Sequence, residues 1–148
     1  MKLDGRQIKL AGEILGSDVE DPASESSVTL SGSFASLPLS ISFRSDRSGS
    51  VLVELAIFLD KTTSGEVAGV EFRLSDGSDP VPGTTRTAIE FHSSNGSTMA
   101  VCAWVLSVTD ATDYTVEVEA RRSSGSSSTI VARYGGARPA ATFRVVGL

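Results

Sequence analysis

The chain has 148 residues, a formal net charge of −5 and a pI near 4.8. This length suits one domain that buries about two-thirds of its unfolded surface, and the acidic balance argues against a nucleic-acid partner, whose phosphates need clustered Lys and Arg. A single cysteine, Cys102, excludes a disulfide within one chain, and its apolar neighbours predict a buried structural thiol.

Residues 1–27 are expected to form an N-terminal arm and linker. The arm's apolar residues are separated by glycines and charges too irregularly for an amphipathic helix, and they are the residues expected to bind a partner: Leu3, Ile8, Leu10, Ile14 and Leu15. The segment 16–27, GSDVEDPASESS, has the acidic, Ser-rich composition of a linker. The start lacks the features of a secretory signal and no apolar run is long enough to cross a bilayer, so we expect no membrane partner and synthesis in the cytoplasm.

Residues 28–148 are predicted to form an all-β domain. Nine runs alternate with a period of two and are separated by Gly, Pro, Ser, Asn or Asp: 28–34, 37–43, 51–60, 67–75, 85–92, 98–109, 113–122, 129–134 and 140–146. No segment with a helical period lies between them. This pattern predicts an antiparallel β-sandwich or barrel and excludes parallel βαβ folds.

Two of these strands are apolar at nearly every position, namely VLVELAIFLD and TMAVCAWVLSVT. A two-layer sandwich covers only one face of each strand, so the second face needs other cover. Two explanations stay open: long central strands that lie under loops, or a subunit interface in which a second copy supplies the cover.

Few residues point to catalysis or metal binding. The one histidine, His92, ends a predicted strand with no triad or zinc motif around it, so it is expected to be a surface residue. Asp76 with Asp79, and Asp110 with Asp113, offer oxygen ligands for calcium, but turn capping is the preferred interpretation of both pairs. Trp104 lies in an apolar strand, where core or interface packing is favoured over sugar stacking. We therefore expect no enzyme activity and no cofactor.

The C-terminal sequence ATFRVVGL resembles the last strand of the trimeric jelly rolls of the tumour necrosis factor and complement-head type, and the preceding hairpin, DYTVEVEARR to TIVARY, is similar to their penultimate strands. The resemblance implies a jelly-roll β-sandwich and a homotrimer. It implies that the interface between subunits includes Phe143, Val145 and Leu148, to which we add Trp104.

Similar endings occur in small structural proteins of tailed bacteriophages, and LDGRQIKLAGEI resembles the N-terminal segments by which phage fibre and decoration proteins attach to a particle. This resemblance implies a trimeric capsid decoration or cement protein at the virion surface, held to the major capsid protein or another virion subunit by its arm. The alternative is a head- or tail-fibre module that binds a receptor, such as a carbohydrate.

Overall fold

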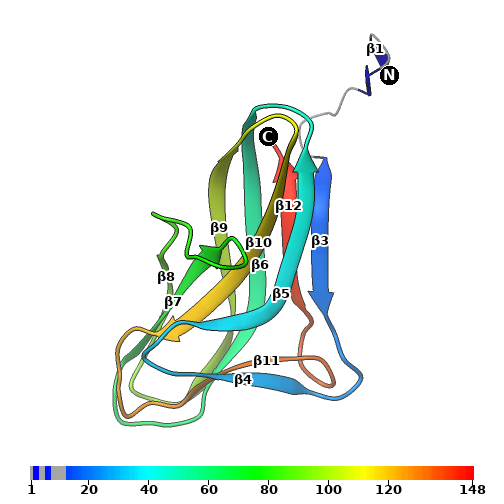
Figure 1. The fold of residues 1–148 in the computed structure, drawn as a ribbon. Coiled ribbons are helices and arrows are strands. Elements are labelled where there is room, and N and C mark those ends of the chain that lie inside the picture. Colours follow the sequence, from blue (N-terminus) through cyan, green and yellow to red (C-terminus); the bar gives the residue numbers. More distant parts are fainter. Residues whose placement is uncertain (1, 4–5, 8–12) are drawn as a thin grey trace.

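A computed structural model describes residues 2–3, 6–7 and 13–148, with side chains from residue 13 onward. All regular structure in these residues is β-strand. Two short strands, β1 (Lys2–Leu3) and β2 (Arg6–Gln7), pair with each other and with no other described strand. The remaining strands form a two-layer antiparallel sandwich, and the expected β-sandwich fold is confirmed (Figure 1).

The smaller sheet has four strands in the order β5-β10-β7-β8. They are β5 (Ala35–Ser45), β7 (Ala68–Ser75), β8 (Arg86–Phe91) and β10 (Thr112–Arg122). β5 alternates strictly, so Leu37, Leu39 and Ile41 point into the core while Pro38 and Ser40 between them face outward. This alternation is the expected pattern of a sheet with one solvent-exposed face.

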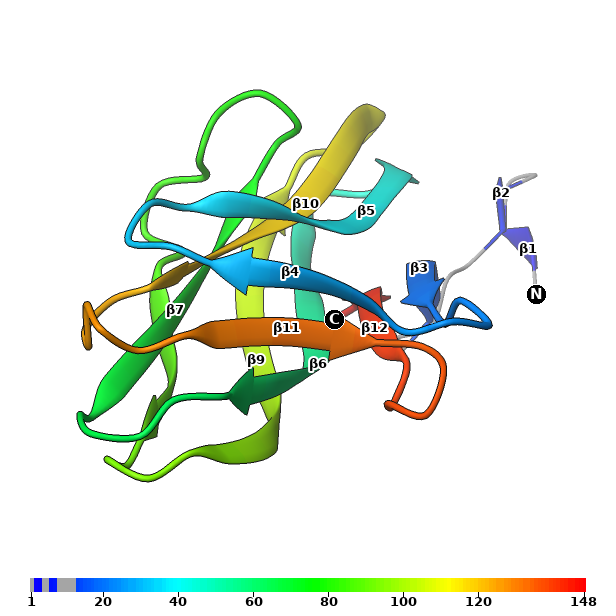
Figure 2. The same cartoon turned by 90° about the horizontal axis from the view of Figure 1, so that it is seen from below.

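The larger sheet has six strands built around β6 (Gly49–Lys61). One edge of β6 pairs along its full length with β9 (Gly96–Val108), and the other edge pairs first with β12 (Ala141–Gly147) and then with β11 (Ile130–Tyr134). β3 (Ile14–Glu20) extends the sheet beyond β12, and β4 (Ser26–Leu30) extends it beyond β11. Figure 2 shows β4 and β11 side by side, and Figure 1 shows that they lie at the lower end of the molecule.

Nine strands lie where the alternation places them, but β3 lies in the segment assigned to arm and linker. The sheet therefore begins at Ile14, and the expected linker does not hold for residues 16–20. Asp18 explains how so polar a segment joins a sheet, because its Oδ2 accepts a hydrogen bond from the backbone N–H of Ser40 at 2.9 Å and so closes the sandwich edge. Gly16 allows β3 to approach β5, since a Cβ on Gly16 would lie 2.3 Å from Cγ2 of Ile41.

The rest of the expected linker is also held against the sandwich. The backbone N–H of Gly136 donates to the carbonyl of Pro22 at 2.9 Å. The carboxylate of Glu25 bridges Arg133 and Arg138 at 2.6 and 2.9 Å, and these guanidinium groups hold its pKa below the ordinary value of 4.5. Residues 22–25 thus form a turn between β3 and β4 that these bonds hold against the sandwich.

The core between the two sheets is apolar and continuous. Its largest enclosed side chains are those of Trp104, Phe72 and Phe143. Each fully buried aromatic or aliphatic side chain contributes about 1.5–3 kcal/mol by removal from water. One charged group is also enclosed: the ammonium of Lys61 donates to the carbonyl of Thr63 at 2.7 Å and to those of Ser93 and Ser94 at longer range.

Candidate interaction surface on the larger sheet

The outward side of β9 is apolar and uncovered. Along this strand Ala100, Cys102 and Trp104 point into the core, whereas Val101 and Val105 point outward and are 69% and 63% exposed. Met99 is also exposed, at 39%. Large β-branched side chains this exposed are unusual on a strand whose other face is fully packed.

The apolar surface continues across β6 because the register places apolar residues of the two strands opposite each other. Leu52 pairs with Val105, Ala56 with Val101, and Phe58 with Met99. On the far side of β6, Val146 of β12 pairs with Leu52. We call this surface the β6–β9 apolar face; its members are Leu52, Ala56, Phe58, Met99, Val101, Ala103, Val105 and Val146.

One ion pair lies within this face. Arg144 of β12 and Glu54 of β6 are register partners, and their side chains meet at 2.5 Å. Glu54 is in turn opposite Ala103 of β9. Toward β11, the guanidinium of Arg138 lies over the ring of Phe58 at 5.1 Å, and Arg133 pairs with Asp60 of β6 at 3.1 Å. The face is therefore apolar along β9 and bordered by charged pairs toward β12 and β11, as in an interface with an apolar centre and a polar rim.

The free edge of β9 adds backbone groups to this surface. Among the described strands β9 pairs only with β6, so its other edge has no ladder of hydrogen bonds. The strand is 13 residues long and contains no charged residue and no proline. Natural edge strands usually carry such residues to prevent pairing with other chains, so this edge has the features of a contact surface.

The outer face of the smaller sheet carries two cross-strand ion pairs over its central strands, β7 and β10. Arg73 contacts Glu119 at 2.5 Å and Arg121 contacts Glu71 at 2.7 Å. Both guanidinium groups lie over the ring of Phe34, at 4.0 and 4.6 Å from its centroid. The exposed apolar side of β9 therefore makes the larger sheet the candidate contact side.

The residues proposed for the trimer interface do not lie together on this surface. Trp104, Phe143 and Val145 are at most 2% exposed within one chain, so they are core residues and the proposed interface role is wrong for them. Leu148 is 51% exposed and remains available. β9 is apolar on both faces, so its sequence could not say which residues face outward. In β12 the polar Thr142 and Arg144 alternate with Phe143 and Val145, and this alternation agrees with the buried position of the latter two.

The five arm residues predicted to bind a partner also lie in different environments. Ile14 and Leu15 belong to β3, where Ile14 is 56% exposed and Leu15 packs against the core. Leu3 lies in β1, and its side chain is outside the described part of the chain. Ile8 and Leu10 also lie outside the described residues.

The candidate catalytic and metal-binding residues do not assemble into a site. His92 is exposed just after β8. Cys102 is buried, and burial raises the pKa of its thiol above 9.0. Among the described residues, no group of three or more His, Cys, Asp or Glu side chains could hold a metal ion, and no helix there is long and apolar enough to cross a membrane.

Asp76 caps a turn, as the sequence favoured over calcium binding. Its Oδ1 accepts the backbone N–H groups of Ser78 and Asp79 at 2.9 and 2.8 Å. These two bonds hold the pKa of Asp76 below its ordinary value of 3.8.

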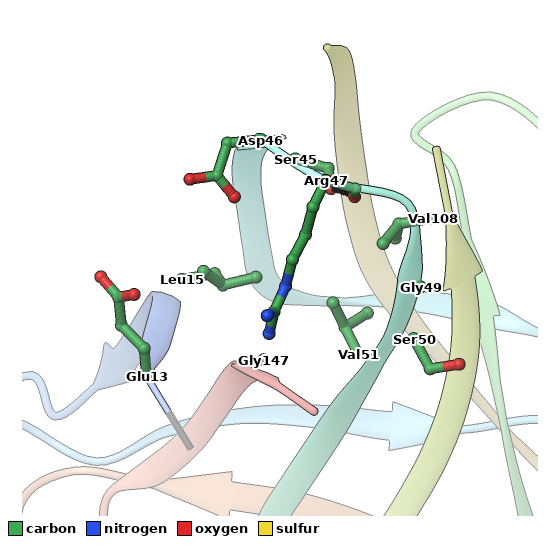
Figure 3. A pocket seen from close by; sticks show the side chains of 10 residues that line it. All are labelled: Glu13, Leu15, Ser45, Asp46, Arg47, Gly49, Ser50, Val51, Val108 and Gly147. Carbon is green, nitrogen blue, oxygen red and sulfur yellow. Dashed lines mark hydrogen bonds between the residues drawn. The ribbon is translucent and has the colours of Figure 1, made fainter. Parts of the chain in front are cut away.

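A small cavity lies where β3, the β5–β6 turn and the C-terminus meet (Figure 3). Arg47 extends into it and donates to the backbone carbonyl of Leu148 at 3.0 Å, while Oε2 of Glu13 is buried with no hydrogen-bond partner among the described residues. Its volume of about 20 Å³ suits a single water molecule and excludes an organic ligand. The cavity is part of the packing at the base of the arm.

No protein-family model matches the chain, and no curated protein matches it. The fold defines it as a jelly-roll β-sandwich. It is similar to the Eiger TNF of S. frugiperda, with a TM-score of 0.51 and 12% identity over 91% of this chain and 92% of the other. This likeness confirms the jelly-roll fold that the C-terminal resemblance implied.

Two further solved structures show lower similarity. The globular domain of the zebrafish complement 1qA protein has a TM-score of 0.45 and 14% identity, covering 90% of this chain and 95% of that one. The CBM22-1 xylan-binding domain of Xyn10C from Paenibacillus barcinonensis has a TM-score of 0.38 and 9% identity, covering 95% and 99%.

Proposed function

We propose that the chain is a non-enzymatic structural module that assembles into a homotrimer through the β6–β9 apolar face. The observation that supports this proposal is the pair of exposed valines, Val101 and Val105, on an uncharged strand with a free edge. Association that removes them from water is favoured by about 25 cal/mol per Å² of apolar surface.

The edge position of β9 bears on the symmetry of the assembly. If β9 of one copy packs against the β6 and β12 part of the face on the next copy, two different surfaces meet. Such a head-to-tail contact closes into a ring when the rotation allows it. Three copies is the number implied by the resemblance to the tumour necrosis factor and complement-head type.

Light scattering coupled to size exclusion tests this assembly. The full chain is expected to elute with three times its own mass of 15.4 kDa. Val101→Arg places a charge in the face and is expected to give the monomer. Ser42→Arg is the matched control, because Ser42 is an exposed strand residue on the smaller sheet, and it should leave the trimer intact. A wild-type monomer at micromolar concentration would contradict the proposal.

Within this class, we propose a decoration protein on the surface of a tailed-phage particle, bound to the major capsid protein or another virion subunit by residues 1–12. Three arms on one trimer would bind with a high effective concentration. The support is the resemblance of LDGRQIKLAGEI to phage attachment segments, together with the absence of any pairing between β1–β2 and the described strands of the sandwich.

Co-sedimentation with purified phage heads tests the virion role. The full chain is expected to sediment with the heads, and a chain that starts at Glu13 should remain a trimer but stay in the supernatant. If both chains sediment with the heads, the sandwich rather than residues 1–12 makes the contact. Binding of neither to any head, combined with a signal on a glycan array, would favour the receptor-binding alternative.

A further inference from the structure

A second surface feature is an open groove at the end of the sandwich where the β9–β10 turn and the β7–β8 loop meet. Its volume is about 750 Å³, far larger than the cavity beside Arg47. The floor is apolar and comes from three strands and one loop: Phe43, Val81, Leu106, Val108 and Val116, with Tyr114 stacked on Phe43 at 5.4 Å between ring centroids. A groove of this size and lining accommodates a short polypeptide segment.

The rim of the groove is acidic. Asp76, Asp79 and Asp113 line it together with Ser78, Ser107 and Thr115. No lysine or arginine is among the lining residues. Outside the lining, Arg44 contacts one carboxylate oxygen of Asp113 at 2.9 Å from an exposed position.

Among the described residues, Asp79 is the groove carboxylate whose side chain has no partner. Its backbone takes part in the turn capped by Asp76, but its side chain makes no hydrogen bond or ion pair with the described residues. The groove therefore combines an apolar floor with a negative charge that nothing in the described sandwich neutralises. Its complement is a segment that carries basic and apolar side chains close together.

Residues 1–12 of this chain have that composition. They contain Lys2, Arg6 and Lys9 against one acidic residue, Asp4, and so carry a formal charge of +2. Since the whole chain carries −5, residues 13–148 carry −7. The same twelve residues include Leu3, Ile8 and Leu10, which alternate with the basic positions.

The position of the arm's base permits the contact. Val108 lines both the groove and the small cavity beside Glu13, so the groove and the start of β3 lie at the same end of the sandwich. Residues 8–12 link the β1–β2 pair to Glu13 and span at most about 17 Å when extended. A tether of this length would let the β1–β2 pair reach an adjoining copy if the assembly places the same ends of two copies side by side.

We propose that the groove binds the basic arm, residues 1–12, of a neighbouring copy. Lys2 or Lys9 lies at the carboxylate of Asp79, and the arm's apolar side chains cover the floor at Val81 and Leu106. The contact gives the arm a docking position within the assembly, in addition to any particle surface. It needs two copies that meet, but neither a three-fold arrangement nor a virion.

Zero-length crosslinking with a water-soluble carbodiimide tests the contact in the full chain. The reagent joins a lysine amine to a carboxylate as an amide only where the two touch. Wild-type protein is mixed from light and ¹⁵N-labelled batches, so mass spectrometry separates links between copies from links within one copy. The expected product joins Lys2 or Lys9 of one copy to Asp79, Asp76 or Asp113 of another, and 0.5 M salt reduces it several-fold.

Val81→Arg, which fills the groove with a cation and leaves all three carboxylates in place, should reduce the product at least fivefold. Glu90→Arg is the control, because Glu90 is exposed on β8 and outside the groove. Circular dichroism checks that both variants fold. If Val81→Arg fails to fold, Ser107→Arg takes its place, because Ser107 is exposed and lines the groove, and it should likewise reduce the groove links while both lysines remain.

Three outcomes overturn the proposal: arm links only within one copy, arm links only to carboxylates outside the groove, or no arm links at all. Light scattering on the same samples keeps this result separate from the assembly proposal. A trimer without groove links leaves the apolar interface standing and refutes the arm contact. Crosslinks between the arm and the groove in a protein that is not a trimer would support the arm contact and refute the trimer.

Discussion

The indole of Trp104 on β9 donates a hydrogen bond to the backbone carbonyl of Thr84, with 2.5 Å between nitrogen and oxygen. Thr84 is itself buried, and its hydroxyl accepts from the N–H of Leu74 and donates to the carbonyl of Val81. The larger sheet is thus joined through one side chain to the loop between β7 and β8. This loop supplies Asp76, Asp79 and Val81 to the groove.

Trp104→Phe should destabilise the chain by about 1–3 kcal/mol, because it leaves the buried carbonyl of Thr84 without its donor. Urea unfolding followed by circular dichroism measures the change, since the substitution removes the single tryptophan. Met99→Leu, on the same strand but facing outward, should change the free energy of unfolding by less than about 0.5 kcal/mol. Equal effects from the two variants would show that the indole bond contributes nothing.

Glu25 is expected to make stability depend on pH. Its folded pKa lies below its unfolded value of 4.5 because Arg138 and Arg133 bond to the carboxylate. The stabilisation is therefore complete above about pH 5 and is lost as the pH falls through the depressed folded pKa. Thermal melts from pH 7 to pH 2.5 should show Glu25→Gln less stable than wild type at neutral pH, with the gap closing in acid.

Glu90→Gln provides the matched comparison, because Glu90 is exposed and its side chain has no partner among the described residues. Its melting curve should follow wild type at every pH. A constant difference between Glu25→Gln and wild type across the range would mean that the bridge to the two arginines is not formed in solution.

Gly125 in the serine loop is expected to be sensitive to substitution. Its φ is +78°, and a Cβ there would lie 2.6 Å from Cβ of Ala68 and 2.7 Å from the carbonyl of Val67. Gly83 has a similar φ of +73° but nothing within 4 Å of its Cβ position. Gly125→Ala should thus add a steric cost to the ~1 kcal/mol backbone cost common to both variants.

Chemical denaturation of the two variants measures the difference, which we expect to exceed about 1 kcal/mol in favour of Gly83→Ala. The loop is also anchored by Ser124, whose hydroxyl accepts from the N–H of Gly69 at 2.8 Å, and by Glu66, which accepts from the N–H of Ser127. A flexible loop of the same length would therefore not replace SSGSSS without loss. Identical losses in the free energy of unfolding for the two glycine variants would show that the serine loop does not pack against Val67 and Ala68.

A double-mutant cycle tests whether β3 belongs to the sandwich. Gly16→Ala should destabilise the chain because its methyl group would overlap the buried side chain of Ile41. Ile41→Ala alone should cost about 2–5 kcal/mol. In the double variant the space left by Ile41 receives the new methyl, so the combined loss should be smaller than the sum of the two. Strict additivity would argue that β3 does not pack there.

The sequence predicted the sandwich because alternation along strands such as β5 and β10 follows directly from a sheet with one buried face. It missed β3 because the residues that fix it, Gly16 and Asp18, act through contacts with Ile41 and Ser40 on the other sheet. Composition alone gives such a segment the appearance of a linker. Side-chain direction also escaped prediction: both faces of β9 are apolar, so only the packed structure distinguishes Trp104 from Val101.

The groove was equally hidden. Asp76, Asp79 and Asp113 lie more than thirty positions apart along the chain in two groups, and each group reads as a turn. Their common position depends on the β7–β8 loop folding back over β9 and β10. Neither the volume of the groove nor the lack of a described partner for Asp79 can be predicted from the local sequence.

The pairing of β3 with β12 also has a consequence for how the chain folds. Residues 14–20 lie beside residues 141–147, so almost the whole chain must be synthesised before the larger sheet can be completed. β6 likewise cannot form this pairing until β9, about fifty positions later in the chain, has been synthesised. Such non-local pairing places this domain among slowly folding β-proteins, in the range of milliseconds to seconds. During that interval the long, uncharged β9 strand is exposed and prone to aggregation.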